Sequence, residues 1–216
     1  MRTYRTVDVS AVILNQNQGI FLERCIRSCL SQTFPGRFFE VLVVDAASTD
    51  FSREVIHSYG RRIQTLFLES PATLEEAAVA GIRRANNGRY TVLVRAQDFL
   101  SDYMLLFQAI WLFQNHDYEG VGVDYWLVDQ GTDTKLRRVS GQEFLTPFGT
   151  MYRKEVFVRE GLYEASYGGR TLPLLQSDSL RKYPTGHINI PFYRYQQDAG
   201  RLAEKMPTGS RADEST

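Results

Sequence analysis

The stretch FEVLVVDAASTD, from Phe39 to Asp50, decides the fold. Its first part is a short run of apolar, mostly β-branched residues that stops at Asp45. Such a run is typical of a strand buried on both faces, as in the parallel sheet of an α/β protein. Ligands of open α/β sheets bind outside the carboxyl ends of the strands. The residues leave two interpretations of Asp45 open: its carboxylate accepts hydrogen bonds from a ribose or a base, or it only ties down the turn.

The segments on either side complete a parallel crossover unit. Residues 50–59 predict a helix capped by Ser48, Thr49 or Asp50. Upstream, residues 7–14 predict the first strand, and a polar loop separates it from a helix with apolar residues at helical spacing. Strand, loop, helix and strand in this order form the βαβ unit, which is right-handed in almost every known case.

The first half of the chain continues in the same way. Apolar runs predict strands over residues 63–68 and 90–94, and an alanine-rich segment predicts a helix over 75–86. A further helix, over 103–114, is so apolar that we expect it to be largely buried.

The pattern changes after residue 119, and we expect a more antiparallel second half. Apolar and polar positions alternate from Gly120, and residues 135–139 are predicted to pair back as a hairpin. Three shorter segments follow: a strand over 150–152, a helix over 153–160, and a last strand over 188–195 in which Pro191 indicates an edge position.

Composition and charge narrow the classes of function. The formal net charge is zero, so the charge balance gives no evidence for a nucleic-acid partner. No stretch approaches the ~18 consecutive apolar residues of a membrane span, and residues 1–14 lack the apolar core of a signal peptide. We therefore expect a cytoplasmic protein without an integral membrane segment.

Cysteine, histidine and aromatic residues form no recognisable motif of their own. Cys25 and Cys29 lie four apart on a predicted helix and are interpreted as small buried hydrophobes, not as a disulfide or a metal site. The remaining candidates are expected at the surface (His57, His116 and His187) or in the packing of the core (Trp111, Trp126, Tyr193 and Tyr195).

Several stretches together resemble one family. They are VSAVILNQNQGIFLERCIRSCLSQTF, FEVLVVDAASTDFSREVI, GIRRANNGRYTVLVRAQDFLS, GTMYRKEVFVREGLYEASYGG and PFYRYQQD. In this order, from about residue 7 to residue 200, they look like a family 2 glycosyltransferase. The resemblance implies the GT-A fold, a Rossmann-like α/β architecture whose mixed sheet is flanked by helices. It also implies transfer of a sugar from a nucleotide sugar to a glycan or other acceptor, with inversion at the anomeric carbon.

The resemblance implies a single GT-A-like domain over residues 1–203. Residues 1–115 would be the nucleotide-binding half and residues 116–203 the acceptor half. Residues 204–216 are small, polar and charged, and we expect them to be disordered. The implied ligands are a nucleotide sugar and a glycan acceptor. Two kinds of protein partner are left open, a second copy of the chain in a homo-oligomer and a partner glycosyltransferase.

The nucleotide motif of the family is partly kept. Asp45 matches the first of two aspartates that precede a glycine and Ser-Thr-Asp, whereas Ala46 and Ala47 replace the second aspartate and the glycine. Asn17 matches the asparagine of the first loop, although Gln16 stands where tyrosine is usual. The resemblance thus implies Asn17 and Asp45 as nucleotide ligands.

The metal motif of the family, Asp-Ala-Asp-Asp after the fourth strand, is degenerate here. Arg95 and Gln97 replace its first two aspartates, and Asp98 remains. Mg²⁺ and Mn²⁺ favour carboxylate oxygens, and a guanidinium inverts the local charge. Arg95 either faces a phosphate, so that it and Asp98 join the nucleotide site, or it pairs with Asp98. We expect no metal cofactor, and Asp98 with Asp198 is the weak alternative for Mg or Mn.

The base motif of the family is not kept. Arg170 and Thr171 occupy the positions of a Glu-Asp pair, and neither side chain is a usable base at neutral pH. Glu164 and Asp178 lie nearby in the sequence and would substitute only after a local rearrangement.

Two hypotheses follow. In the first, the chain is a glycosyltransferase with weak or metal-independent activity. Asn17 and Asp45 hold the nucleoside, Arg95 neutralises the diphosphate either alone or together with Arg170, and the base is unassigned. In the second, it is a catalytically inactive GT-A-like domain that acts as a binding or scaffold partner.

Overall fold

The fold is described from a computed structural model, for residues 7–33, 39–85, 88–129, 132–142, 146–163 and 183–197. Several residues singled out in the sequence lie outside these ranges: Glu164, Arg170, Thr171, Asp178, Asp198 and the tail 204–216.

The first half is a parallel sheet, as predicted. Its strands are β1 (Val7–Asn15), β2 (Phe39–Asp45), β3 (Gln64–Phe67) and β4 (Gly88–Arg95), arranged in the order β3-β2-β1-β4. All three of their pairings are parallel. The strand that ends at Asp45 therefore lies inside the sheet, between β3 and β1.

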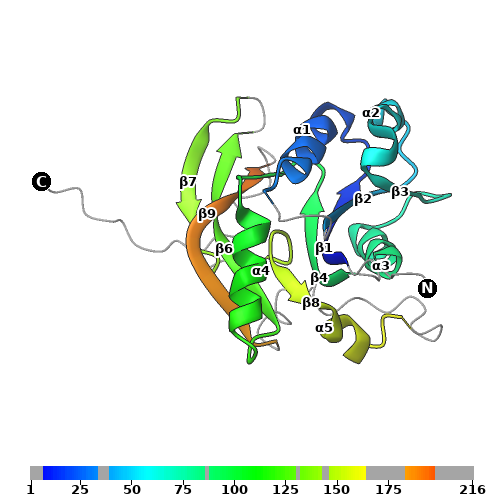
Figure 1. Ribbon diagram of the computed structural model, residues 1–216. Coiled ribbons are helices and arrows are strands. Elements are labelled where there is room, and N and C mark those ends of the chain that lie inside the picture. The colour runs from blue at the N-terminus through cyan, green and yellow to red at the C-terminus, as the bar shows by residue number, and fades with distance from the viewer. Residues whose placement is uncertain are drawn as a thin grey trace, which may run out of the picture.

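Helices cover this parallel half (Figure 1). They are α1 (Gly19–Leu30), α2 (Ser52–Tyr59) with the following 3-10 turn η1 (Gly60–Arg62), and α3 (Leu74–Arg84). Packing of α3 is close at Gly81, where a Cβ atom would lie 2.5 Å from Val12 Cγ1. Cys25 and Cys29 are buried free thiols on the inner face of α1, as expected.

The start of α2 differs from the sequence prediction. Its N-cap is Phe51, and no side chain caps the helix there. Asp50 instead joins two helix starts, because its Oδ2 accepts from Gly19 N at 2.9 Å and its Oδ1 from Ser52 N at 3.0 Å. Burial alone raises the pKa of Asp50, but these hydrogen bonds outweigh it and lower that pKa below its ordinary value.

The second half extends the same sheet. Its strands are β5 (Phe99–Leu100), β6 (Gly120–Asp129), β7 (Lys135–Val139), β8 (Met151–Arg153) and β9 (Thr185–Gln197). The order continues β4-β8-β6-β9-β5, with β7 on β6. All these pairings are antiparallel except β6 with β9. The helices are α4 (Met104–Gln114) and the short α5 (Lys154–Arg159).

The last strand is longer than predicted and is not simply an edge. Strand β9 pairs with β6 along its length and with β5 near its end, and Figure 1 shows it curving along one side of the molecule. Pro191 lies where the register of β9 against β6 shifts, opposite Asp124. Proline lacks the N–H of a regular ladder, so a bulge accommodates it inside a sheet.

The prediction that the helix over 103–114 is largely buried is wrong for one of its faces. The inner face packs on the core through Met104, Leu105, Ala109 and Leu112. The outer face leaves Phe107, Ile110 and Phe113 exposed by 48, 47 and 61%. Apolar residues thus lie on both faces of α4, and the outer face is largely exposed although Phe107 contacts the ring of Phe192. Among the described residues, no helix is long and apolar enough to cross a membrane.

Candidate functional site

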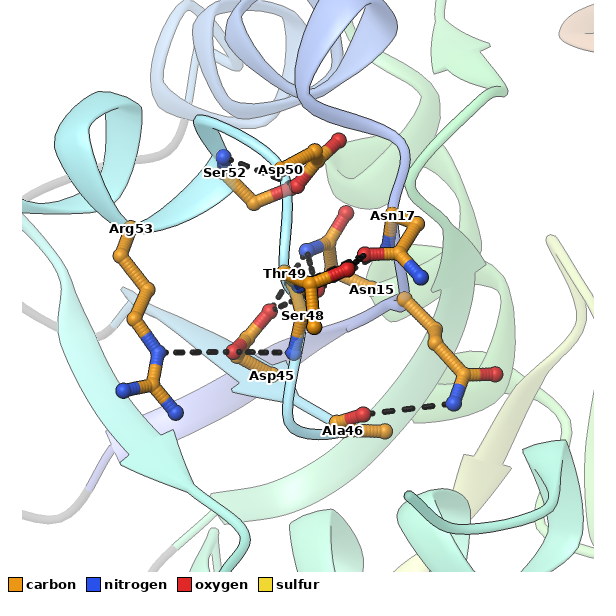
Figure 2. Close-up of polar contacts among 10 residues, drawn as sticks. Asn15, Asn17, Asp45, Ala46, Ser48, Thr49, Asp50, Ser52 and Arg53 are labelled. Carbon is orange, nitrogen blue, oxygen red and sulfur yellow. Dashed lines mark hydrogen bonds and ion pairs between the residues drawn. The ribbon is translucent and has the colours of Figure 1, made fainter. Parts of the chain in front are cut away.

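The Asp45 carboxylate lies at the carboxyl end of β2 and is held by protein donors (Figure 2). Its Oδ1 accepts from Asn15 Nδ2 at 2.7 Å and from Ser48 Oγ at 2.5 Å, and its Oδ2 accepts from Ser48 N at 3.2 Å. Arg53 Nε lies 3.5 Å from Oδ2. Asp45 is 1% exposed. The geometry matches the interpretation that Asp45 ties down the turn, and its role as a nucleotide ligand stays a prediction.

Two loops meet above this carboxylate, one after β1 and one after β2. Asn17 joins them, because its backbone N donates to Ser48 Oγ at 2.9 Å and its Oδ1 accepts from Thr49 N at 2.8 Å. Asn17 is exposed and has a left-handed φ of 52°. Its amide Nδ2 has no hydrogen-bond partner among the described residues, so it is placed to donate to a ligand above the strand ends.

Ala47 occupies the tight turn of the second loop. Its φ is also 52°, a conformation in which glycine is favoured and an L side chain costs energy. This is the position at which the family pattern has glycine. Alanine therefore adopts a left-handed conformation here that glycine would adopt without a Cβ clash.

Asn15, Asn17, Asp45, Ser48 and Thr49 form a hydrogen-bonded cluster at the ends of β1 and β2, which we call the nucleotide cradle. Sequence reasoning missed Asn15. It is buried, and its amide donates to both Asp45 Oδ1 and Ser48 Oγ, the latter at 3.1 Å. Its Oδ1 is buried without a hydrogen-bond partner among the described residues. The signal for it was available, since Asn15 is the last residue of β1 and pairs with Asp45 in the sheet.

Arg95 and Asp98 form an ion pair where the family has its metal motif. Arg95 Nε lies 2.7 Å from Asp98 Oδ2, and Arg95 Nη2 lies 2.8 Å from Oδ1. Two residues of β9 complete the set of donors: Tyr193 OH at 2.6 Å from Oδ2 and Gln196 N at 2.8 Å from Oδ1. Asp98 is fully buried, and four donors fill the acceptor sites of its carboxylate.

The surroundings keep Arg95 charged and fixed. Burial alone lowers the pKa of Arg95, but the charge of Asp98 outweighs it and raises that pKa above its ordinary value. The guanidinium also stacks on Tyr195, 3.8 Å from the ring centroid, and donates to the carbonyl of Gln196 at 3.0 Å. The alternative in which Arg95 pairs with Asp98 is confirmed, and Tyr193 and Tyr195 are packing residues as expected.

The residues at this position do not fit a divalent cation. The Asp98 carboxylate is saturated by donors, and the guanidinium of Arg95 lies where a cation would have to be. Asp198 is outside the described residues. Within the described part of the chain, no group of three or more histidine, cysteine, aspartate or glutamate side chains could hold a metal.

A second polar cluster lies on β6, β7 and β9, and the sequence analysis did not find it. Asp124 is 2% exposed and is contacted by His187 Nε2 at 2.7 Å and by Arg138 Nη2 at 2.5 Å. The expectation that His187 is a surface residue is therefore wrong: its side chain is 12% exposed and paired with a buried carboxylate. His57 and His116 are exposed, as expected.

With this geometry in place, comparison with known proteins assigns the class. The chain belongs to glycosyl transferase family 2, whose model matches residues 10–169. No curated protein matches the sequence.

Two solved structures of glycosyltransferases are similar to this chain in fold. One is TarS 1–349 from S. aureus in complex with UDP-GlcNAc, with a TM-score of 0.69 and 16% identity, covering 93% of this chain and 62% of that chain. The other is the mannosyltransferase PcManGT from Pyrobaculum calidifontis in complex with GDP-Man and Mn²⁺, with a TM-score of 0.66 and 15% identity, covering 93% and 59%. The fold is therefore GT-A, and the chain spans less than two thirds of either relative.

Proposed function

We propose that the chain binds a nucleotide sugar across the carboxyl ends of β2, β1 and β4 and transfers its sugar without a divalent metal. The observation that carries the proposal is the position of the Asn17 and Asp45 loops. They lie side by side at the carboxyl edge of two adjacent parallel strands, where open α/β sheets bind their ligands.

The proposed roles follow from exposure. Asn17, whose amide is exposed, contacts the nucleoside, while Asp45 and Asn15 fix the loop beneath it. Arg95 supplies positive charge to the diphosphate through its Nη1, since Nε and Nη2 are engaged by Asp98 and Gln196. An arginine in this role would take the place of a metal ion. The acceptor is a glycan or another hydroxyl compound.

A second function has its own observation in support. The Asp98 carboxylate has all its acceptor sites filled, and it neutralises the charge of Arg95. This pairing favours an inactive GT-A domain that binds a nucleotide or a partner glycosyltransferase without turnover. The chain could serve in that way alone or as a homo-oligomer. The two functions differ in turnover, and the second does not depend on nucleotide binding.

Thermal unfolding with a nucleotide panel tests the proposal. UDP, GDP, CMP, dTDP and their sugar conjugates are compared with Mn²⁺ and with a chelator. A ligand at 100-fold its dissociation constant adds about 2.7 kcal/mol of stability, and we expect the chelator to leave that gain unchanged. Asn17→Gly, which keeps the left-handed φ but removes the amide, should weaken the gain. Gln114→Ala, an exposed amide at the end of α4, is the matched control.

Two results would contradict the proposal in different ways. No stabilisation by any nucleotide would overturn the nucleotide cradle and leave only a scaffold role. Stabilisation that needs Mn²⁺ would overturn the role of Arg95 in place of the cation.

A further inference from the structure

The outer face of helix α4 carries a stripe of large apolar side chains. Leu106, Ile110 and Phe113 follow one another at positions i, i+4 and i+7, and Phe107 lies beside them. This spacing is typical of the residues by which one helix packs against another. Tyr103, at the N-cap of α4, extends the stripe by one turn and is 48% exposed. Figure 1 shows α4 lying across β6 and β9, and no described helix or strand lies in front of it.

The ring contacts of the stripe lie at its margins. Phe107 contacts Phe192 of β9, with the ring centroids 5.5 Å apart, and Phe113 contacts His116 of the following loop at 6.3 Å. Ile110 lies between these two contacts, and about half of its side chain is exposed. The contacts therefore border the stripe and leave its middle open to a partner.

The exposed apolar area is large enough for a dimer of the chain. At ~200 Å² for a whole large side chain, the exposed fractions of the side chains of the stripe correspond to roughly 400 Å² per copy. Two copies that pair through it would bury roughly 800 Å² of apolar surface. Because homodimer interfaces are about 65% apolar, the whole interface would cover about 1,200 Å². Specific protein–protein interfaces begin near this value.

The absence of charge on α4 favours a second copy of the chain as the partner. A two-fold axis brings the same surface of both copies together, so a charged residue on that surface would meet a like charge. The 11 residues of α4 include no aspartate, glutamate, lysine or arginine. Its two glutamines are neutral, and Gln108 is buried while Gln114 is exposed. The stripe is therefore compatible with its own copy.

The charges at the ends of α4 disfavour a lipid surface as the partner. Helices that lie on membranes usually carry lysine and arginine beside their apolar face. The nearest residues in the sequence with a full charge at neutral pH are Asp102 and Asp117, which are both exposed. Arg153 reaches the carboxyl end of α4, but it donates to the carbonyls of Asn115 at 3.2 Å and of Tyr118 at 2.7 Å. An anionic bilayer would thus meet a carboxylate at each end of the helix.

We propose that the chain forms a two-fold symmetric dimer through the outer faces of two α4 helices. Ile110 is the centre of the stripe, three residues from both Phe107 and Phe113, so the axis passes beside it. Phe107 of one copy then lies near Phe113 of the other. A crossing angle near −50°, the commonest class of helix packing, separates the acidic ends of the two helices. The inference goes beyond the proposed function and does not rest on nucleotide binding.

Sedimentation equilibrium of the full-length chain tests the dimer. The wild type is measured from about 1 to about 100 µM, beside Ile110→Glu and Val158→Glu, and a thermal melt of dilute protein checks that each variant folds. We expect the wild type to dimerise and Ile110→Glu to raise the dissociation constant at least ~100-fold, because the axis places two carboxylates in one apolar contact. Val158, which is 55% exposed on α5, is the matched control, and its substitution should leave the dissociation constant unchanged.

Cysteine cross-linking tests the geometry of the contact. The native Cys25 and Cys29 are buried, so they do not compete with an introduced cysteine. Two helices with axes 8–10 Å apart and a Cα radius of ~2.3 Å bring facing Cα atoms to ~3.4–5.4 Å, which overlaps the range of disulfides. Ile110→Cys should therefore form an intermolecular disulfide under mild oxidation. Leu136→Cys, at a position 55% exposed on β7, should not.

Three results would overturn the proposal. They are a wild type that stays monomeric, a dimer that Ile110→Glu leaves intact, and cross-linking of Ile110→Cys no faster than that of Leu136→Cys. A monomer that co-sediments with phosphatidylserine vesicles, and loses this binding in Ile110→Glu, would assign the stripe to a lipid surface instead.

Stabilisation by nucleotides is measured on the same proteins, so that the two proposals can fail separately. A dimer that no nucleotide stabilises would support the α4 contact and overturn the proposed function. A monomer that nucleotides stabilise would do the reverse.

Discussion

Replacing Arg95 by methionine should destabilise the protein strongly. The substitution removes two of the four hydrogen bonds that hold the Asp98 carboxylate, those from Nε at 2.7 Å and Nη2 at 2.8 Å. Asp98 is fully buried, so its charge would remain in the interior with only Tyr193 and Gln196 as donors. Loss of one partner of a buried pair costs about 3–5 kcal/mol. For a chain of this length, that corresponds to a fall of roughly 6–20 °C in Tm.

Urea unfolding of Arg95→Met, Asp98→Asn and the double variant measures this cost. The double variant should recover part of the loss, because it leaves no uncompensated charge. Arg53→Met is the matched control: its arginine side chain is 48% exposed and lies 3.5 Å from Asp45, and we expect a change below about 1 kcal/mol. A loss in Arg95→Met as small as that of the control would refute the reasoning that this pair is a buried structural element.

Three further predictions concern local structure and pH. Ala47→Gly should raise the free energy of unfolding by about 1 kcal/mol, because glycine adopts the φ of 52° without the Cβ clash; a loss of stability in urea would contradict this. Thr73→Ala should cost about 1 kcal/mol by the same assay, since the Thr73 hydroxyl accepts from Glu76 N in the capping box of α3, and an unchanged midpoint would count against that box. Burial raises the pKa of Tyr163 to about 12, above its value in the unfolded chain. The contribution of Tyr163 to the free energy of unfolding should therefore be complete below pH ~10 and be lost as the pH rises toward 12. In a pH series of thermal melts, Tyr163→Phe should show a smaller fall of Tm over this range.

The parallel half could be predicted closely because its signals are local. The runs before Asp45 and Arg95 have the length and β-branched composition of buried strands, and the structure ends β2 and β4 at these residues. The alternation from Gly120 likewise predicted β6 and its hairpin with β7.

The second half depended on contacts between distant residues, which periodicity does not encode. His187 and Asp124 lie far apart in the sequence and meet because β9 runs parallel to β6, with His187 opposite Gly122. Arg95 illustrates a different reason. A guanidinium beside a strand end suits a phosphate or a carboxylate equally well, and only the position of Asp98 three residues later decides that it pairs inward.

Strand β9 carries groups of both polar centres on one backbone. Tyr193 and Gln196 hold the Asp98 carboxylate, and His187, near the start of the same strand, holds Asp124. Side chains alternate between the faces of a sheet, so a slip of one residue against β6 would turn the side chains of Tyr193 and His187 away from their partners. The same slip would move the backbone N–H of Gln196 away from Asp98. One change in the register of β9 would therefore disrupt both polar clusters together. A fragment designed for expression has to include β9 through Gln197.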